Sequence, residues 1–374
     1  MSRGIINGQA GIHKIRKDQM KSLQIGNLTI AVPVIQGGMG VGISLSGLAA
    51  AVANEGGVGV ISSAGLGLLY KKFSANFLDA SIYGLREEIR KAREKTLGVI
   101  GVNVMVAMTN FADMVKTAIS AKADIIIAGA GLPLNLPSFL NKESITKLIP
   151  IVSSARAVRI ICDKWKSNYD YLPDAVIVEG PKAGGHLGFK EEEIGDSDYS
   201  LEKLVQQIIN ELKPFEEKYN HPIPLIAAGG IYTGGDINNI MKLGASGVQM
   251  GTRFVTTNEC DASPGFKQSY IDAEEKDIEI IKSPVGMPGR AIFSNFIRKV
   301  KDGKRHPKKC PFKCIHTCNI DKSPYCIIVA LISALRGNFE NGFAFAGSNA
   351  FRATKISSVK EIFQSLLKEY RESI

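Results

Sequence analysis

The sequence lacks the short motifs that identify several classes of protein. It has no Gly-x-Gly-x-x-Gly fingerprint, no Walker A loop and no recognised nucleic-acid-binding motif. A dinucleotide-binding doubly wound sheet, a P-loop protein and a nucleic-acid partner are therefore not expected. The first 21 residues contain no apolar stretch of the kind found in secretion signals, which predicts a cytoplasmic protein.

Charge is missing from one long stretch, which runs from Ser22 to Asn54. A membrane-spanning helix needs about 20 consecutive apolar residues, and here Pro33 and the glycines between Gly37 and Gly42 interrupt the run. The stretch is predicted to form a strand, a loop and a buried helix. No membrane association is expected.

Acidic residues are outnumbered by basic ones, with 36 Asp and Glu against 46 Lys and Arg and a formal net charge of +10. A positive charge excess that is concentrated in one short segment is typical of a solvated loop. The alternative is a docking surface for an acidic partner or an anionic substrate. Much of the excess falls in one basic segment, which contains Lys299, Lys301, Lys304, Arg305, Lys308 and Lys309.

Eight short apolar runs alternate with helical stretches along the first 260 residues. Each run is apolar nearly throughout, as expected of parallel strands that are buried on both faces. Eight such units match a (β/α)8 TIM barrel, an α/β fold that takes roughly 250 residues. The runs are Val32–Ile35, Val58–Ser62, Val99–Val104, Asp124–Ile127, Ile149–Ser153, Ala175–Val178, Ile223–Ala227 and Val248–Met250.

The alternation ends near residue 260. The sequence therefore predicts a barrel over residues 1–260 and an inserted or appended α-rich subdomain over residues 261–347, laid across one end of the barrel. Residues 348–374 are expected to add a C-terminal helix that packs on the barrel. Within the subdomain, Ser283–Arg290 is rich in turn-forming residues.

Two glycine-containing loops follow the seventh and eighth predicted strands. Gly229 and Gly230 lie in the first loop, and Gly251 and Thr252 in the second. In TIM barrels these loops commonly bind a phosphate group through backbone N–H groups. A capping box that begins at Thr233 is expected to open the next helix towards the same anion.

His186 is the histidine that follows a predicted barrel strand among glycines. Its position suits a proton donor or acceptor near neutral pH. A hydrogen-bonding loop histidine is the alternative.

Five motifs occur in order along the chain: Pro33–Met39, Gly101–Met105, Val178–His186, Ile226–Ile231 and Gln249–Phe254. Together they resemble the nitronate monooxygenase family, formerly called 2-nitropropane dioxygenases. The same superfamily contains the flavin-dependent enoyl-acyl-carrier-protein reductases of the FabK type. The resemblance covers about Gln24 to Phe254, with a weaker match near Phe343–Asn349.

The resemblance implies a TIM barrel that binds FMN noncovalently, with His186 as the catalytic histidine. It places the loop of Gly37, Gly38 and Met39 near the flavin ring. It implies that the remaining cofactor-binding residues are Asn103, Glu179, Gly184, Gly229, Gly230, Gln249, Met250, Gly251 and Thr252.

Glu179 and Lys182 depart from the family pattern. Many members have Gln in place of Glu179 and Glu in place of Lys182. An anionic Glu179 would disfavour a reduced anionic flavin, so the contact that this residue makes is open.

Four of the six cysteines cluster at Cys310, Cys314, Cys318 and Cys326. Their spacing matches neither the paired Cys-x2-Cys of common zinc sites nor a ferredoxin run. We expect reduced thiols and no metal, with a zinc or iron–sulfur site as the alternative.

The resemblance implies an oxidoreductase in which FMN and O2 convert an alkyl nitronate to a carbonyl compound and nitrite. The first alternative is an NADH- and FMN-dependent enoyl-thioester reductase, whose partner would be an acidic carrier protein. The second is a flavin- or phosphate-binding module without turnover. The sequence leaves the oligomeric state and the substrate itself open.

Overall fold

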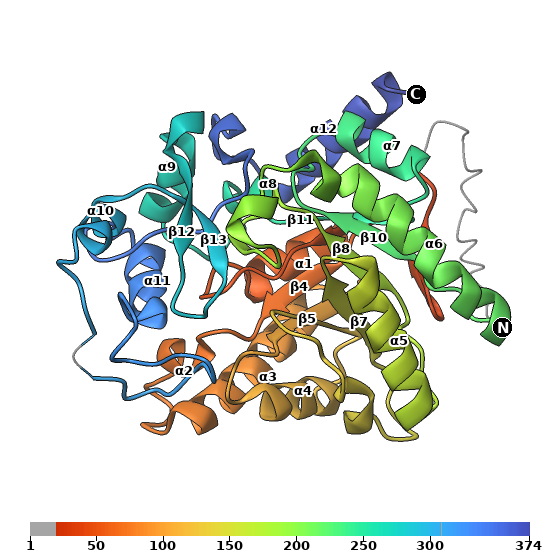
Figure 1. The fold of residues 1–374 in the computed structure, drawn as a ribbon, viewed down its shortest axis with the longest axis horizontal. Coiled ribbons are helices and arrows are strands. Elements are labelled where there is room, and N and C mark those ends of the chain that lie inside the picture. The colour runs from red at the N-terminus through yellow and green to blue at the C-terminus, as the bar shows by residue number, and fades with distance from the viewer. Residues whose placement is uncertain (1–19, 308) are drawn as a thin grey trace, which may run out of the picture.

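The computed structural model describes residues 20–307 and 309–374, so Lys308 of the basic segment lies outside the described residues. Eight parallel strands form the barrel (Figure 1). Its closure is completed by a bridge between Ile35 and Val58. The predicted (β/α)8 fold is confirmed. In barrel order the strands are β3 (Val34–Gln36), β11 (Gly247–Met250), β10 (Leu225–Ala228), β8 (Val176–Glu179), β7 (Lys147–Val152), β6 (Ile125–Gly129), β5 (Ile100–Met105) and β4 (Gly59–Ser62).

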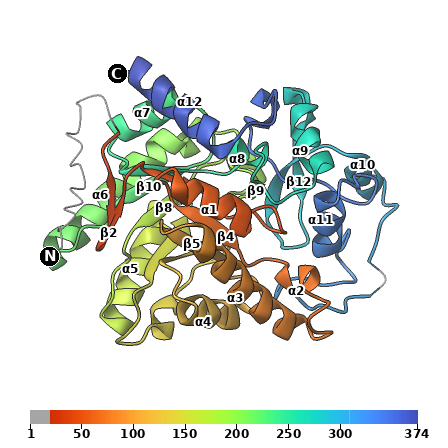
Figure 2. The same cartoon turned by 180° about the vertical axis from the view of Figure 1, so that it is seen from behind.

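Helices cover the outside of the barrel (Figures 1 and 2). The β6–β7 connection has only the 3-10 turn Leu136–Phe139. Ser358 caps the C-terminal helix, which packs against the helix that follows β10. The helices are α1 (Ser46–Asn54), α2 (Leu66–Leu69), α3 (Phe77–Lys95), α4 (Phe111–Ser120), α5 (Ala155–Tyr169), α6 (Leu201–Tyr219), α7 (Gly234–Lys242), α8 (Thr252–Val255) and α12 (Val359–Glu372).

The barrel interior is apolar from its floor to near its mouth. Branched side chains such as Val60, Ile127 and Ile177 fill it. A hairpin that the sequence analysis did not predict, β1 (Leu23–Ile25) and β2 (Leu28–Ile30), adds buried side chains to the same cluster. This hairpin belongs to the charge-free stretch Ser22–Asn54, so its burial leaves no charged side chain without solvent.

The subdomain contains three helices, α9 (Pro264–Ile271), α10 (Asn295–Lys301) and α11 (Ile327–Leu335). It also contains an antiparallel hairpin of β12 (Ile278–Lys282) and β13 (Pro288–Ile292). The expectation of an α-rich subdomain missed this hairpin. Pro288 and Gly289 resemble turn residues, but Pro is tolerated at the first position of a strand.

The hairpin connects the subdomain to the barrel. Strand β13 pairs with the two-residue strand β9 (Gly185–His186), which lies in the loop after β8. Within the described residues, no helix is long and apolar enough to cross a membrane.

Close packing of α1 against β4 gives a test of the fold. A Cβ atom on Gly59 would lie 1.8 Å from the carbonyl oxygen of Ala49. Gly59→Ala should therefore lower the free energy of unfolding by about 3 kcal/mol, the upper end of typical overpacking costs. Gly195→Ala is the control, because a Cβ there meets no atom within 4 Å. Equal midpoints of chemical unfolding for the two variants would contradict the observed packing.

Candidate active site

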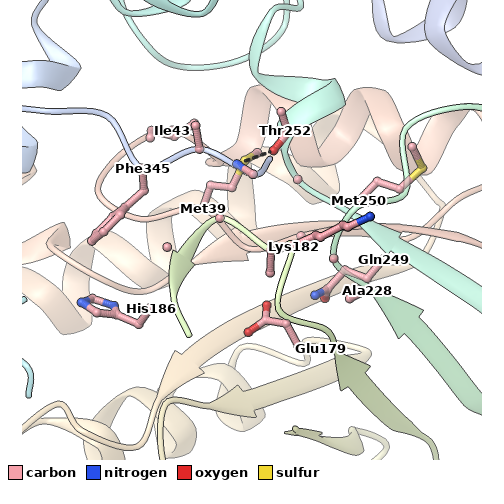
Figure 3. Close-up of a pocket in the computed structure, with 18 of the residues that line it drawn as sticks. Met39, Ile43, Glu179, Lys182, His186, Ala228, Gln249, Met250, Thr252 and Phe345 are labelled. Carbon is pink, nitrogen blue, oxygen red and sulfur yellow. Dashed lines mark hydrogen bonds between the residues drawn. The ribbon is translucent and has the colours of Figure 1, made fainter. Parts of the chain in front are cut away.

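A cavity of about 220 Å³ lies at the carboxyl ends of the barrel strands. Figure 3 shows side chains from several strand ends converging on it. It contains His186 and ten of the twelve residues predicted to bind the cofactor: Gly37, Met39, Glu179, Gly184, Gly229, Gly230, Gln249, Met250, Gly251 and Thr252.

Gly38 and Asn103, the other two predicted cofactor residues, are not among the cavity-lining residues. They pack against each other directly behind the loop, where a Cβ on Gly38 would lie 2.2 Å from the Cβ of Asn103. Gly38 therefore lets the loop approach β5 closely. In this structure Asn103 supports the loop instead of facing the cavity.

A polar layer covers the apolar interior at the barrel mouth. Glu179 of β8 is in register with Ala228 of β10, which is in register with Gln249 of β11. Because neighbouring residues in register point to the same side of a sheet, and Ala228 belongs to the interior cluster, Glu179 and Gln249 point inward. Gln249 Oε1 is buried and has no hydrogen-bond partner among the described residues. A buried orphan acceptor of this kind indicates a site for a ligand with a donor group.

The loop after β10 exposes its backbone to the cavity. Gly229 and Gly230 have φ angles of +96° and +86°, a conformation that favours glycine. A Cβ on Gly229 would lie 2.8 Å from the carbonyl oxygen of Gly180, and one on Gly230 would lie 2.9 Å from the Cβ of Lys182. Within the described parts of the chain, the N–H groups of Gly229, Gly230 and Gly251 donate to no protein acceptor. Three free N–H groups around one space suit an anion such as phosphate.

The segment Phe343–Asn349 closes this loop pair from the opposite side. The Gly347 N–H donates to Thr252 Oγ1 at 3.0 Å, and Asn349 Nδ2 donates to the Gly230 carbonyl at 2.7 Å. Phe345 also lines the cavity. The sequence analysis assigned no site residue here, although the weak motif match at Phe343–Asn349 was the signal that could have identified them.

The predicted role of the α7 N-terminus as part of an anion site is wrong. The capping box is confirmed, since Thr233 Oγ1 accepts from Asp236 N at 3.1 Å. However, the Thr233 N–H donates to Asp236 Oδ2 and the Gly234 N–H donates to Glu369 Oε2, both at 2.8 Å. Carboxylates of the protein itself therefore occupy this helix end, and one of them comes from α12.

Lys182 supplies positive charge at the glycine loops. Its side chain lines the cavity beside Gly230, and it forms no ion pair with any described residue. This cation is suitably placed for an anionic ligand, which gives a physical reason for Lys at a position where many family members have Glu.

His186 is fixed by the subdomain hairpin. Its Nε2 lies 2.7 Å from Ser283 Oγ, and its ring contacts Phe345 edge-on with centroids 4.9 Å apart. Arg290 of β13 donates from Nη1 to the carbonyl oxygens of Pro181 and Ala183, at 2.5 and 2.7 Å. These contacts hold both ends of the loop that carries His186.

Burial shifts two titratable groups of the cavity, His186 and Glu179, towards their neutral forms. It lowers the pKa of His186 to about 4 and raises the pKa of Glu179 to about 7. At neutral pH the imidazole is therefore uncharged. In the tautomer whose Nε2–H donates to Ser283 Oγ, the Nδ1 lone pair is free to accept a proton. The Glu179 carboxyl is half-protonated near pH 7, so it is able to act as a hydrogen-bond donor as Gln does.

The four clustered cysteines lie outside this cavity. Across residues 20–307 and 309–374, no three His, Cys, Asp or Glu side chains are arranged to hold a metal ion.

Much of the basic segment is paired within the subdomain, since Lys299 binds Glu340 at 2.8 Å and Lys301 binds Glu279 at 2.5 Å. These pairs favour the solvated-loop interpretation over a docking surface.

Comparisons with known proteins agree with this geometry. The sequence model described as nitronate monooxygenase matches residues 21–369. A probable nitronate monooxygenase of Staphylococcus saprophyticus is 28% identical over 310 residues, which cover 74% of this chain and 80% of that protein. The (3aS,4S,5R,7aS)-5-hydroxy-7a-methyl-1-oxo-octahydro-1H-indene-4-carboxyl-CoA dehydrogenase of Mycobacterium tuberculosis is 26% identical over 73% of this chain and 66% of its own. The structure of FabK from Thermotoga maritima is 30% identical with a TM-score of 0.69, and the match covers 92% of this chain and 94% of that one.

The buried carboxyl of Glu179 predicts a pH-dependent loss of stability. Unfolding returns its pKa from about 7 to its ordinary value of 4.5, so between these values the unfolded chain releases a proton that the folded chain retains. Stability therefore falls as the pH rises through this window. Since the carboxyl faces a cavity, we expect Glu179→Gln to gain about 2 kcal/mol relative to wild type between pH 5 and pH 8.

The measurement is chemical unfolding of the cofactor-free proteins at both pH values. His186 is present in both proteins, so its opposite pH dependence cancels in the difference. A stability difference that does not change with pH would show that Glu179 is ionised throughout.

Proposed function

The chain belongs to the nitronate monooxygenase family and is a flavin-type oxidoreductase, and from this premise we propose that it is an FMN-dependent enzyme that oxidises alkyl nitronates with O2. The products would be a carbonyl compound and nitrite. One observation carries the proposal: the same cavity is lined by a neutral His186 and by the glycine loops whose free N–H groups suit a phosphate.

The residues around the cavity fit a flavin mononucleotide. The N–H groups of Gly229, Gly230 and Gly251, with Lys182, would hold its phosphate. Gln249, with its orphan Oε1, and the protonated form of Glu179 would serve the polar edge of the ring system. The absence of a dinucleotide fingerprint favours FMN over FAD.

When bound, FMN would supply the electron transfer between the substrate and oxygen. The chain supplies proton handling and orientation. His186 would take the α-proton of a neutral nitroalkane at Nδ1, while Ser283 holds Nε2 and Phe345 limits rotation of the ring. For a nitronate, which has already lost that proton, the same side chain would orient the nitro group.

A second candidate function is an enoyl-thioester reductase. It is favoured by the 30% identity to FabK over 92% of this chain. In that reaction NADH would supply the reducing equivalents, and His186 would deliver a proton to the α-carbon of the thioester after itself taking up a proton. An acidic carrier protein would then be a partner.

The proposed phosphate site is tested by Gly251→Val. Gly251 has φ −101° and ψ −63°, which any residue is able to adopt. The nearest atom to an added Cβ is Met39 Sδ at 3.4 Å, so the variant should fold. Its side chain would occupy the space of the phosphate oxygens, and the flavin-to-protein ratio should fall by at least tenfold.

Absorbance spectra give this ratio, and chromatography of the heat-released cofactor identifies FMN or FAD. Gly195→Val is the matched control and should remain yellow. A Gly251→Val protein with stoichiometric flavin would refute the assignment of the phosphate loops.

The role of His186 is tested by His186→Asn, which removes the basic nitrogen and keeps a polar side chain. FMN content should not change. The rate with neutral nitroalkanes should fall by about 10²–10⁴-fold, the usual scale of acid–base catalysis. Preformed nitronates should be affected much less. Oxygen uptake measures both rates.

NADH oxidation with a crotonyl thioester separates the two candidate functions in the same variant. A reductase would keep flavin reduction by NADH and lose thioester reduction. If nitroalkane, nitronate and thioester rates all remain within about twofold of wild type, His186 has no catalytic role.

A further inference from the structure

A second space continues from the catalytic cavity on the far side of His186. We name this space of about 50 Å³ the apolar annex. It shares Val41, Ala64, Met105, His186 and Leu331 with the catalytic cavity, so the two spaces are neighbours with a common boundary. The annex is thus placed to receive a part of the substrate that does not react.

The lining of the annex contains almost no polar group. Apart from His186, its side chains are aliphatic, aromatic or sulfur-containing, as with Met108, Val285 and Ile328. Burial raises the pKa of the Cys314 thiol, which also lines the annex, to about 12, so this thiol is uncharged at neutral pH. An apolar space lined in this way offers water few hydrogen-bond partners.

Residues 310–318, which we call the cysteine-bearing segment, contribute Cys314 and Ile315 to the wall of the annex. This segment is hydrogen-bonded to the barrel. The Thr109 N–H donates to the Cys314 carbonyl at 3.2 Å, and the His316 N–H donates to the Ala107 carbonyl at 3.0 Å. Met108 and Ile315 form an antiparallel bridge between these two bonds. These two hydrogen bonds, which pair Met108 with Ile315, hold this wall against the barrel.

We infer that the apolar annex binds the unbranched alkyl chain of the substrate while the reacting end remains beside His186. The inference rests on the proposed function and narrows it from alkyl nitronates in general to primary nitronates with a linear chain. It also gives the cysteine-bearing segment a role, since Cys314 and Ile315 close the chain site.

The size of the annex sets the chain length. A cavity of about 10–15 Å³ is large enough for one water-sized group, so 50 Å³ has room for a short alkyl chain of a few carbons. Each buried methylene contributes about 0.8 kcal/mol, which corresponds to about a fourfold gain in affinity. Affinity should therefore rise about fourfold per carbon over the first few carbons and then level off.

The experiment combines catalysis with binding that needs no chemistry. Oxygen uptake gives kcat/KM for the nitronates of 1-nitroalkanes from nitroethane to 1-nitrodecane. In parallel, the rise in Tm with concentration gives the affinity of n-alkanols from propanol to decanol, which contain no nitro group.

Two substitutions change the annex in opposite directions. Cys314→Phe should fill it, lowering the ratio of kcat/KM between 1-nitrohexane and nitroethane nitronates by at least tenfold. Ile328→Ala should enlarge it and move the plateau to longer chains. Cys310→Phe adds the same volume in the same segment at a residue that does not line the annex, and it should keep the wild-type profile.

The outcomes separate the inference from the function on which it rests. Nitronate oxidation without chain-length dependence, or identical profiles for Cys314→Phe and Cys310→Phe, would overturn the annex and leave the proposed function intact. Chain-length-dependent alkanol binding that Cys314→Phe abolishes, in a protein that oxidises no nitronate, would support the annex and refute the proposed function.

Discussion

The active site depends on the buried guanidinium of Arg290. It donates to two carbonyl oxygens, those of Pro181 and Ala183, in the loop that runs from Glu179 to His186. Burial lowers its pKa, but an arginine remains charged in a protein, so the carbonyl dipoles must stabilise the cation. The contact therefore fixes the loop and the subdomain hairpin relative to each other. The β9–β13 pairing and the Ser283–His186 hydrogen bond join the same loop to the same hairpin.

The same burial determines the charge of the site. The hairpin and Phe343–Asn349 surround His186 and Glu179, which are half-buried on the cavity wall. Both groups shift towards their neutral forms, so partial protonation of Glu179 near pH 7 reduces the negative charge that would oppose a reduced anionic flavin. Lys182, at the glycine loops, is left to provide the positive charge for an anionic ligand.

The sequence predicted the barrel because its strands are apolar on both faces, and such runs stand out whatever surrounds them. Most of the residues that it assigned to the site also line the cavity, namely His186 and ten of the twelve cofactor residues. It did not predict β13, because Pro288 and Gly289 have turn propensities and are held in a strand only by β9 and β12. It misjudged the α7 N-terminus because Glu369, which occupies it, lies more than a hundred residues away. Both failures concern contacts between distant segments, which local patterns do not encode.

The barrel and the segments added to it contribute different parts of the site. This explains why membership of the family does not specify a substrate. The loops after β10 and β11, which are suited to the cofactor, belong to the barrel and lie within the motifs shared with the family. Part of the wall that would meet the substrate comes from outside the barrel: Phe345 beside His186, and Cys314 and Ile315 at the annex. A relative that conserves the barrel but replaces these walls would bind the same cofactor and a different substrate. Identities of 26–30% to a carboxyl-CoA dehydrogenase, a nitronate monooxygenase and FabK are therefore consistent with one cofactor site and several substrate sites. We therefore expect the substrate specificity of this chain to depend on these wall residues.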